Sequence, residues 1–300
     1  MDCLSAFELY VSHSDVFGGN QTPLEAAEYA VVGVPFDLTS TYRRGARLAP
    51  LAIREASLNI ETYSFGSKID FSDLRVHDLG NLHTSNNVTK TIKNLEETVK
   101  DLIGTSKIPV LIGGEHTITL GAARALGGEN LAVISFDAHL DLHNTFLDTA
   151  VNHTTFMRRL NEQVKPDVIV EVGTRAVCKE ELNYAEEAGI QYFTTNMIEK
   201  NGLEATIKEV VKLIEDCQST YLTIDMDVLD PAFAPAVQNP EPNGLSSQSL
   251  LAFISNLCDK RLAILDLVEV APPYDHGVTA IQAARLLFEA LCYTSKAREN

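Results

Sequence analysis

The chain has 300 residues, of which 45% are hydrophobic, so it is long enough to bury a sizeable core. Its formal net charge of −17 argues against nucleic acid as a partner, because an acidic surface repels phosphate backbones. The sequence contains no uncharged apolar stretch long enough to cross a bilayer, so it predicts neither a membrane span nor a membrane partner.

The N-terminal segment and the cysteines favour a cytoplasmic location. Residues 1–17 contain three acidic residues and no Lys or Arg, whereas a secretory signal begins with basic residues. The five cysteines are scattered and never form a Cys-x-x-Cys pair, which is typical of reduced thiols rather than of disulfides or a zinc–thiolate site. No linker-like segment interrupts the chain, so we expect one domain over residues 1–300, with residues 1–27 as an N-terminal arm.

Eight short apolar runs rich in β-forming residues predict strands. Most of them are continuous rather than alternating, as expected of strands that are buried on both faces of a sheet. In chain order they are Ala30–Val34, Leu74–Leu79, Val110–Gly113, Leu131–Phe136, Val168–Gly173, Ile190–Phe193, Thr220–Ile224 and Leu262–Val270.

Stretches with helical spacing lie between many of these runs. The alternation predicts a mostly parallel sheet with helices on both faces, in which ligands bind beyond the carboxyl ends of the strands. Polar side chains follow four of the predicted strands at that position. The predicted helices are Val88–Ile103, Thr117–Leu126, Lys179–Ala188, Leu203–Cys217, Ser247–Leu257 and Thr279–Leu291.

The first polar cluster is Gly113-Gly114-Glu115-His116-Thr117, directly after a predicted strand. Its two glycines allow a sharp turn, and His116 stands where a helix begins. A lone histidine at such a position is more often a capping or packing residue. His116 therefore becomes a candidate ligand only together with the other clusters.

The second cluster is Asp137-Ala138-His139-Leu140-Asp141, which follows the strand Leu131–Phe136. Alternate residues of an extended segment point to the same side, so Asp137, His139 and Asp141 can converge on one volume. Three such groups at the end of a buried strand are unfavourable unless their charge is neutralised. This spacing favours a metal site over a solvated loop.

The third cluster repeats the spacing with Asp225 and Asp227, after the strand Thr220–Ile224. Asp230 precedes Pro231, which predicts a turn, and we interpret it as structural. The four carboxylates of the second and third clusters and the two histidines make six oxygen and nitrogen ligands without a cysteine, which favours manganese or a similarly hard ion. Six ligands are too many for one catalytic ion that keeps an open position, so we predict two ions that share bridging carboxylates.

The fourth cluster contains Glu269, an acid within the last apolar run. A buried carboxylate without a partner is unfavourable. A bound guanidinium group would satisfy it through two parallel hydrogen bonds. A salt bridge with one of the protein's own arginines is the simpler explanation when Glu269 is considered alone.

Taken together, these segments resemble the ureohydrolase family, which includes arginase, agmatinase, guanidinobutyrase and formimidoylglutamase. The four motifs follow the family order, and the resemblance extends from about residue 30 to about residue 290. The matching segments are GGEHT (113–117), SFDAHLD (135–141), IDMDVLDP (224–231) and DLVEVAPPYD (266–275).

The resemblance implies a three-layer α/β/α sandwich with a mostly parallel eight-stranded sheet, and two manganese ions per chain. One ion would be held by His116, Asp137, Asp141 and Asp225. The other would be held by Asp137, His139, Asp225 and Asp227, so that Asp137 and Asp225 bridge the two ions. A homotrimer or homohexamer is also implied.

The resemblance further implies a mechanism. A hydroxide that bridges the two ions attacks the guanidinium carbon, and Asp141 orients this hydroxide. Glu269 binds the guanidinium group, and His153, twelve residues after Asp141, binds substrate and shuttles protons. The expected catalytic residues are therefore Asp141, His153 and Glu269.

Two positions argue against arginine as the small guanidino substrate. Arginases bind the head of the amino acid partly through an Asn two residues after the D-A-H-x-D motif, where this chain has His143. They also carry an acidic residue soon after the Gly-x-Arg segment, whereas Arg175 is followed by Ala176-Val177-Cys178-Lys179. We therefore expect agmatine, split into urea and putrescine, with arginine, guanidinobutyrate and formiminoglutamate as alternatives.

Two other classes of function remain open. A non-catalytic homologue would keep the fold, but such relatives usually lose metal ligands, and all six are present here together with His153 and Glu269. A deacetylase-like amidohydrolase normally uses one zinc ion, and the GGEHT and DLVEVAPP segments fit it poorly. The number of bound metal ions separates these alternatives.

Overall fold

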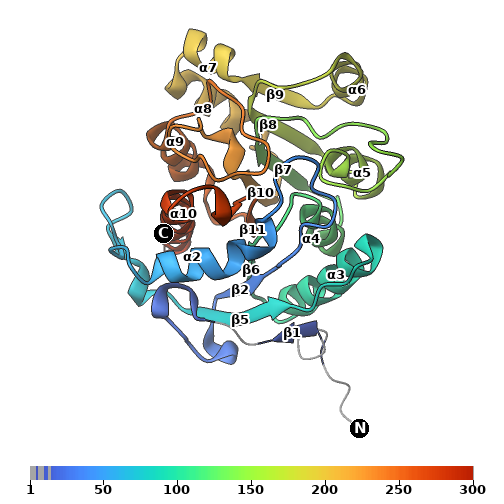
Figure 1. Cartoon of the computed structure of the whole chain (residues 1–300). Coiled ribbons are helices and arrows are strands. Elements are labelled where there is room, and N and C mark those ends of the chain that lie inside the picture. The colour runs from blue at the N-terminus through green and yellow to red at the C-terminus, as the bar shows by residue number, and fades with distance from the viewer. Residues whose placement is uncertain (1–4, 6–9, 13–14, 300) are drawn as a thin grey trace.

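A computed structural model describes Ser5, residues 10–12 and residues 15–299. A central sheet lies between two layers of helices (Figure 1). One layer contains α3 (Val88–Gly104), α4 (Ile118–Leu126), α5 (Phe156–Gln163) and α6 (Lys179–Ala188). The other contains α2 (Ala49–Ser57), α7 (Thr195–Asn201), α8 (Leu203–Leu213), α9 (Ser247–Leu257) and α10 (Val278–Glu299). No helix in the described part of the chain combines the length and the apolar character that a membrane span requires.

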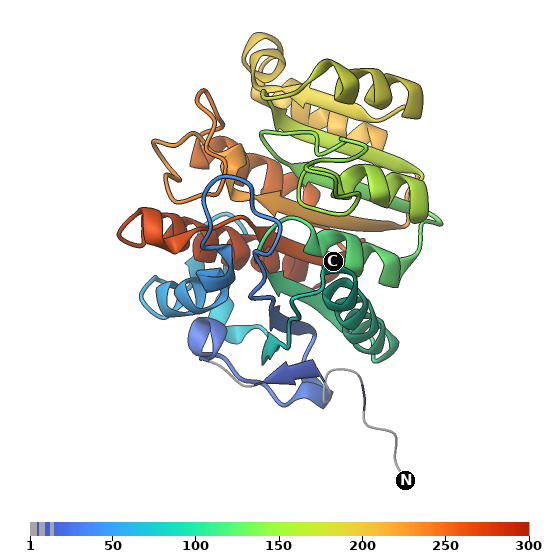
Figure 2. The same cartoon turned by 45° about the vertical axis from the view of Figure 1, so that its right-hand side comes forward.

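All eight predicted strands are confirmed, and they run parallel to one another in the order β5-β2-β6-β11-β10-β7-β8-β9. A ninth strand, β1 (Val11–Ser12), pairs antiparallel with β5 at the edge. The dark-blue N-terminal strand and the yellow β9 lie at opposite ends of the sheet (Figure 2). The parallel strands are β2 (Tyr29–Gly33), β5 (Val76–Leu82), β6 (Ile108–Ile112), β7 (Leu131–Phe136), β8 (Val168–Thr174), β9 (Gln191–Thr194), β10 (Ser219–Asp225) and β11 (Leu262–Val268).

The remaining elements are short. A two-stranded hairpin consists of β3 (Tyr63–Ser64) and β4 (Ile69–Asp70). The 3₁₀ helices are η1 (Phe17–Gly19), η2 (Leu24–Ala26), η3 (Ala46–Leu48), η4 (Phe71–Asp73), η5 (Met226–Val228) and η6 (Pro272–Tyr274).

Continuous apolar strands supply both faces of the sheet. In β2, Tyr29 and Val31 belong to the core on the side of α2 and α10, whereas Ala30 and Val32 belong to the core on the side of α3 and α4. All four are fully buried. Because side chains alternate along a strand, an uninterrupted apolar run fills two separate cores.

Several predicted boundaries are wrong. β11 ends at Val268 rather than Val270, because Glu269 has a φ of 69°, a left-handed conformation that a strand cannot contain. α8 ends at Leu213, and α10 continues to Glu299. In the described part of the chain, three short helices were not predicted: α2, α5 and α7, of nine, eight and seven residues.

The expected N-terminal arm, residues 1–27, lies partly outside the described residues. In its described part, Phe17 is fully buried. The centroid of its ring lies 5.7 Å from that of Phe71 and 5.3 Å from that of Phe288 in α10. This part of the segment therefore packs into the core.

A buried ion pair that the sequence did not reveal joins α2 to β5. The guanidinium group of Arg54, fully buried, donates from Nε to Asp78 Oδ2 at 2.7 Å and from Nη2 to Asp78 Oδ1 at 2.8 Å. Arg54 also donates to Asn81 and to the carbonyl of Gly80. Asp78 accepts from the backbone of Phe17 as well. Both charges are thus satisfied without water, which is the condition for a tolerable buried pair.

Replacing Arg54 with Met should destabilise the fold by about 3–5 kcal/mol, because Asp78 would remain buried without its partner. Urea denaturation gives the free energy of unfolding. The matched control is Arg75→Met. The Arg75 side chain is 64% exposed and pairs with Glu28, so its loss should lower the free energy of unfolding by no more than about 1 kcal/mol. Equal small losses in the two variants would contradict this assignment.

Candidate metal centre

The candidate ligands follow four central strands that are adjacent in the sheet, in the order β6-β11-β10-β7. His116 follows β6, Glu269 follows β11, Asp225 ends β10 and Asp137 follows β7. The carboxyl ends of these strands therefore bring together residues that are far apart in the sequence, at the place where open α/β sheets bind their ligands.

The turn after β6 depends on Gly114. A Cβ atom at this position would lie 2.1 Å from the carbonyl oxygen of Phe36, so no larger residue fits. The backbone N–H of Glu115 donates to the same oxygen at 2.7 Å, and the N–H of Glu269 donates to the carbonyl of Gly114 at 2.8 Å. These bonds fix the segment that carries His116 against the end of β11.

Asp137 stands between two histidines. Its Oδ2 lies 3.0 Å from Nδ1 of His116, and its Oδ1 lies 3.4 Å from Nδ1 of His139. Asp225 Oδ2 lies 3.2 Å from the same atom of His116, and Asp227 Oδ2 lies 3.1 Å from that of His139. Asp137 therefore belongs to two adjoining groups of three potential metal ligands, with one oxygen facing each histidine.

Asp141 lies at the edge of this arrangement. Its Oδ2 is 3.7 Å from Nδ1 of His116, and its backbone has a φ of 51°. Oδ1 of Asp225 accepts the N–H of Asp227 at 2.8 Å, so only Oδ2 faces His116. The expected roles of Asp141 in holding an ion and of Asp225 in bridging two ions stay predictions. We call the six residues the carboxylate centre: His116, Asp137, His139, Asp141, Asp225 and Asp227.

The carboxylates of this centre are crowded and nearly inaccessible to water. Each of the four aspartates is at most 7% exposed. Burial raises the pKa of Asp141 well above its usual value, and the charge of Asp137 raises it further. Burial and the charge of Asp227 do the same to the pKa of Asp225. The carboxylates can all be ionised together only if positive charge lies among them.

The histidines respond in the opposite direction. Burial alone would lower the pKa of His116, but Asp137 and Asp141 raise it to about 9. Burial also opposes protonation of His139, whose pKa Asp227 and Asp137 nevertheless raise well above the usual value. Protons on the two rings therefore balance the carboxylates in a chain without metal.

The orientation of His116 fits a metal ligand better than a hydrogen-bond donor. Its buried Nδ1 faces the carboxylates of three aspartates within 3.7 Å, and a single N–H could donate well to only one of them. Oxygen and imidazole nitrogen atoms are the donors that manganese and similar divalent ions prefer. The residues of the carboxylate centre thus suit a pair of such ions.

A second layer of polar groups orients His116. Its Nε2 lies 2.8 Å from the hydroxyl oxygen of Thr223 on β10. Beside this contact, Thr119 donates to Asp266 Oδ2 at 2.7 Å, and the hydroxyl of Tyr221 donates to the same oxygen. A partner on the second ring nitrogen fixes the direction of the first, as in many metal sites.

Glu269 is held by neutral donors. The backbone N–H of His116 donates to its Oε1 at 2.7 Å, and the amide of Gln238 donates to its Oε2. Ser40 in turn donates to the amide oxygen of Gln238. Burial raises the pKa of Glu269 to about 8. Among the described residues no arginine pairs with Glu269, so the simpler explanation, a salt bridge within the protein, is wrong for this part of the chain.

His153 lies in the segment between β7 and α5 and is almost completely buried. Its Nδ1 is 3.3 Å from the hydroxyl of Thr39, and its Nε2 is 3.1 Å from the hydroxyl of Thr41 and 3.5 Å from the side-chain nitrogen of Asn239. Burial, together with the charges of the nearby His139 and His116 of the carboxylate centre, lowers the pKa of His153 to about 4. The ring is thus positioned by side chains from two other loops.

Sequence reasoning missed these supporting loop residues. Thr39 holds Glu115 as well, through its backbone N–H at 2.7 Å and its hydroxyl at 2.5 Å. Because Thr39 follows β2, the rule about the carboxyl ends of strands could have indicated it. Gln238 and Asn239 lie in an irregular loop, where no periodic pattern points to them.

A pocket of about 260 Å³ opens beside the carboxylate centre. Among the described residues that line it, none is a lysine or arginine. Its wall is fixed by Arg175, whose Nη2 donates to the carbonyl oxygens of Asp227 at 2.6 Å and Glu241 at 2.9 Å. The lining residues are His139, Asp141, His143, Thr154, Ala176, Val177, Cys178, Glu181 and Glu241.

Comparisons with known proteins agree with this geometry. The sequence model of the arginase family matches residues 27–293. The agmatinase of Bacillus anthracis is 32% identical over 92% of this chain and 95% of its own length. The N(1)-aminopropylagmatine ureohydrolase of Thermococcus kodakarensis is 35% identical over 89% of this chain and 91% of its own length.

A solved structure shows the same similarity to agmatine hydrolases. The agmatine ureohydrolase of Thermoplasma volcanium superimposes with a TM-score of 0.89 at 34% identity, covering 96% of this chain and 97% of that one. The shared sheet, the match over nearly the whole chain and the gathered motifs lead to one conclusion. The chain belongs to the arginase family and is a hydrolase of carbon–nitrogen bonds that is similar to agmatinases.

Proposed function

We propose that the protein hydrolyses agmatine to urea and putrescine with two manganese ions bound in the carboxylate centre. The observation that carries this proposal is the position of Asp137, whose two oxygens face two different histidines. Two divalent ions held in this way would supply a hydroxide from water at neutral pH and polarise the guanidino group. A single-zinc deacetylase would not require this duplicated ligand set.

The other residues have separate tasks in this proposal. Glu269 orients the guanidinium group, because its carboxylate already lies beside His116 and matches a planar donor pair. Asp141 accepts a hydrogen bond from the nucleophile. His153, whose ring Thr39 and Thr41 position, transfers a proton to the departing amine.

The charge of the pocket beside the centre supports a cationic tail on the substrate. Glu181 and Glu241 line this pocket, and its described lining contains no lysine or arginine. An ammonium group is favourable there, whereas the carboxylate of arginine, guanidinobutyrate or formiminoglutamate would be repelled. Two of the relatives are named for guanidino compounds with amine tails, agmatine and N(1)-aminopropylagmatine. Putrescine made in this way would enter polyamine biosynthesis; the cytoplasmic location and the trimeric or hexameric assembly stay predictions.

Urea release from a panel of substrates tests the choice of agmatine. The manganese-loaded protein should have a higher kcat/KM with agmatine than with N(1)-aminopropylagmatine, arginine, 4-guanidinobutyrate or formiminoglutamate. Formamide release replaces urea release as the readout for formiminoglutamate. Asp137→Asn should abolish turnover, because it removes an oxygen charge shared by both ligand groups, whereas the exposed Asp216→Asn should not. A preference for a substrate with an acidic tail would overturn the substrate choice, and equal activity of Asp137→Asn would overturn the proposed metal site.

Glu269→Gln should lower kcat/KM for agmatine by about 10- to 100-fold, the loss expected for one hydrogen-bonded charge pair. Steady-state kinetics measure the effect, and circular dichroism and manganese content establish that the fold and the metal are retained. The matched control is Glu204→Gln, an exposed residue of α8. Unchanged kinetics in Glu269→Gln would show that this carboxylate does not contact the substrate.

A further inference from the structure

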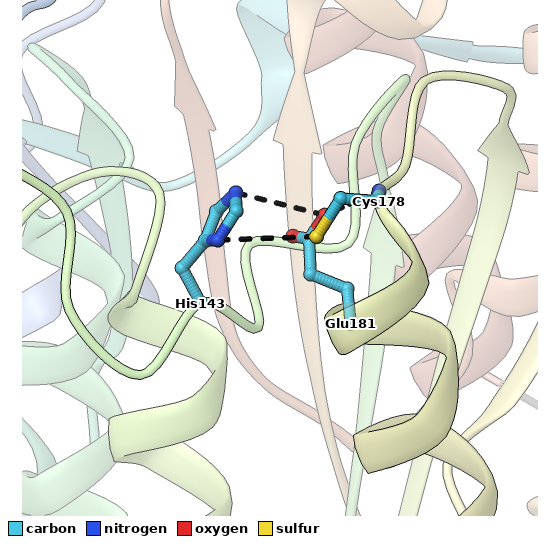
Figure 3. A group of neighbouring side chains, drawn as sticks. All are labelled: His143, Cys178 and Glu181. Carbon is cyan, nitrogen blue, oxygen red and sulfur yellow. Dashed lines mark hydrogen bonds and ion pairs between the residues drawn. The ribbon is translucent and has the colours of Figure 1, made fainter.

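Three side chains outside the carboxylate centre form a second cluster that contains a thiol. Sγ of Cys178 lies 4.0 Å from Nδ1 of His143, and Oε2 of Glu181 lies 3.7 Å from Nε2 of the same ring. Figure 3 shows the ring of His143 presenting both nitrogen atoms to the thiol and the carboxylate. We call His143, Cys178 and Glu181 the thiol cluster.

We infer that the thiol cluster is a third metal site, which binds a thiophilic divalent ion such as Zn²⁺. One ligand atom from each residue lies within 4.8 Å of the others. A tetrahedral zinc ion holds sulfur, nitrogen and oxygen ligands about 3.3–3.6 Å apart, so small side-chain rotations would bring the three atoms to one ion. One ring nitrogen of His143 binds the ion, and the pocket leaves the fourth position open to water or another ligand.

The backbone around the cluster is already fixed. Glu181 Oε1 accepts the N–H of Leu142 at 3.1 Å, and Oε2 accepts the N–H of Cys178 at 2.9 Å. One carboxylate therefore ties the loop after β7, which carries His143, to the start of α6, which carries Cys178. Because these bonds fix the Glu181 side chain and the backbone beside His143 and Cys178, binding an ion would require side-chain rotations but little movement of the backbone.

The donor set separates this site from the carboxylate centre. Among the groups of potential ligands in the described residues, only the thiol cluster contains sulfur. A thiolate favours zinc, cadmium or cobalt over manganese, whereas the carboxylates of the other centre suit harder ions. On binding, the Cys178 sulfur forms a bond to the ion and releases its proton to the solvent.

An ion bound at the thiol cluster would affect catalysis, because the cluster lies beside the carboxylate centre. The pocket that the cluster lines is also lined by His139 and Asp141 of the carboxylate centre. Zinc bound there would add positive charge where we place the cationic tail of the substrate, so it should raise KM for agmatine more than it lowers kcat. This consequence rests on the proposed function, but binding of the ion does not.

Cobalt is the spectroscopic probe for the site. The full chain, loaded with manganese, is titrated with Co²⁺ while thiolate-to-cobalt charge-transfer absorption is recorded. We expect this absorption to saturate at one equivalent. Cobalt that replaces manganese in the carboxylate centre gives no such band, because no thiol lies among those six ligands. Cys178→Ser should lose the band, and the matched control Cys217→Ser, a buried cysteine of another segment, should keep it.

A second variant distinguishes a built site from a single reactive thiol. His143→Gln should weaken cobalt binding by about tenfold or more, since it removes one ligand of three. Absence of the band in the wild type, its persistence in Cys178→Ser, or unchanged affinity in His143→Gln would each overturn the inference. If the band appears as expected and no substrate yields urea, the third site stands and the proposed function fails.

Discussion

The structure depends on one electrostatic constraint, the gathering of four buried aspartates at the carboxyl ends of two strands. Asp137 and Asp141 follow β7, and Asp225 and Asp227 come at the end of β10, the strand beside it. Parallel pairing leaves these carboxylates no way to separate, and burial keeps water from screening them. Positive charge must therefore lie between them, and the two histidines aimed at Asp137 mark where it belongs.

The sheet also supplies the layer beneath this centre. Strand register places Ser135 opposite both Glu171 and Thr223, and Thr223 opposite Asp266, so that a polar row crosses four adjacent strands. Thr223 in this row contacts His116. Burial raises the pKa of Glu171 and of Asp266, which favours their neutral forms and avoids further negative charge below the aspartates. Thr223 is the member of this row that contacts the ligand above it, whereas both carboxylate oxygens of Glu171 accept no hydrogen bond from the described residues.

The sequence predicted those parts of the site that directly follow a regular strand. Asp137, His139 and Asp141 repeat every second residue after an apolar strand, and this local pattern indicates a shared direction. Gln238 and Asn239 lie in an irregular loop, where neither periodicity nor spacing reveals a contact. Arg54 and Asp78 were invisible for a related reason, because a lone charge in an amphipathic helix does not tell which strand it will face.

The thiol cluster shows a further limit of reasoning from spacing. Cys178 is 35 positions from His143 and no Cys-x-x-Cys motif includes it, so spacing in the sequence does not indicate that the two side chains lie together. The parallel sheet brings the two residues together because β7 and β8 are neighbours, and the segments that follow them, with His143 and Cys178, leave the sheet at the same edge. Proximity in such a fold follows strand order, which the sequence does not state.

The number of manganese ions bound per chain tests the central claim most directly. The protein would be stripped with a chelator, reloaded with excess manganese, passed over a sizing column and analysed for metal and protein. The account predicts two ions per chain, because Asp137 serves two adjoining ligand groups. One ion per chain, or none, would contradict it, since at least one of the two ligand groups that share Asp137 would then bind no ion.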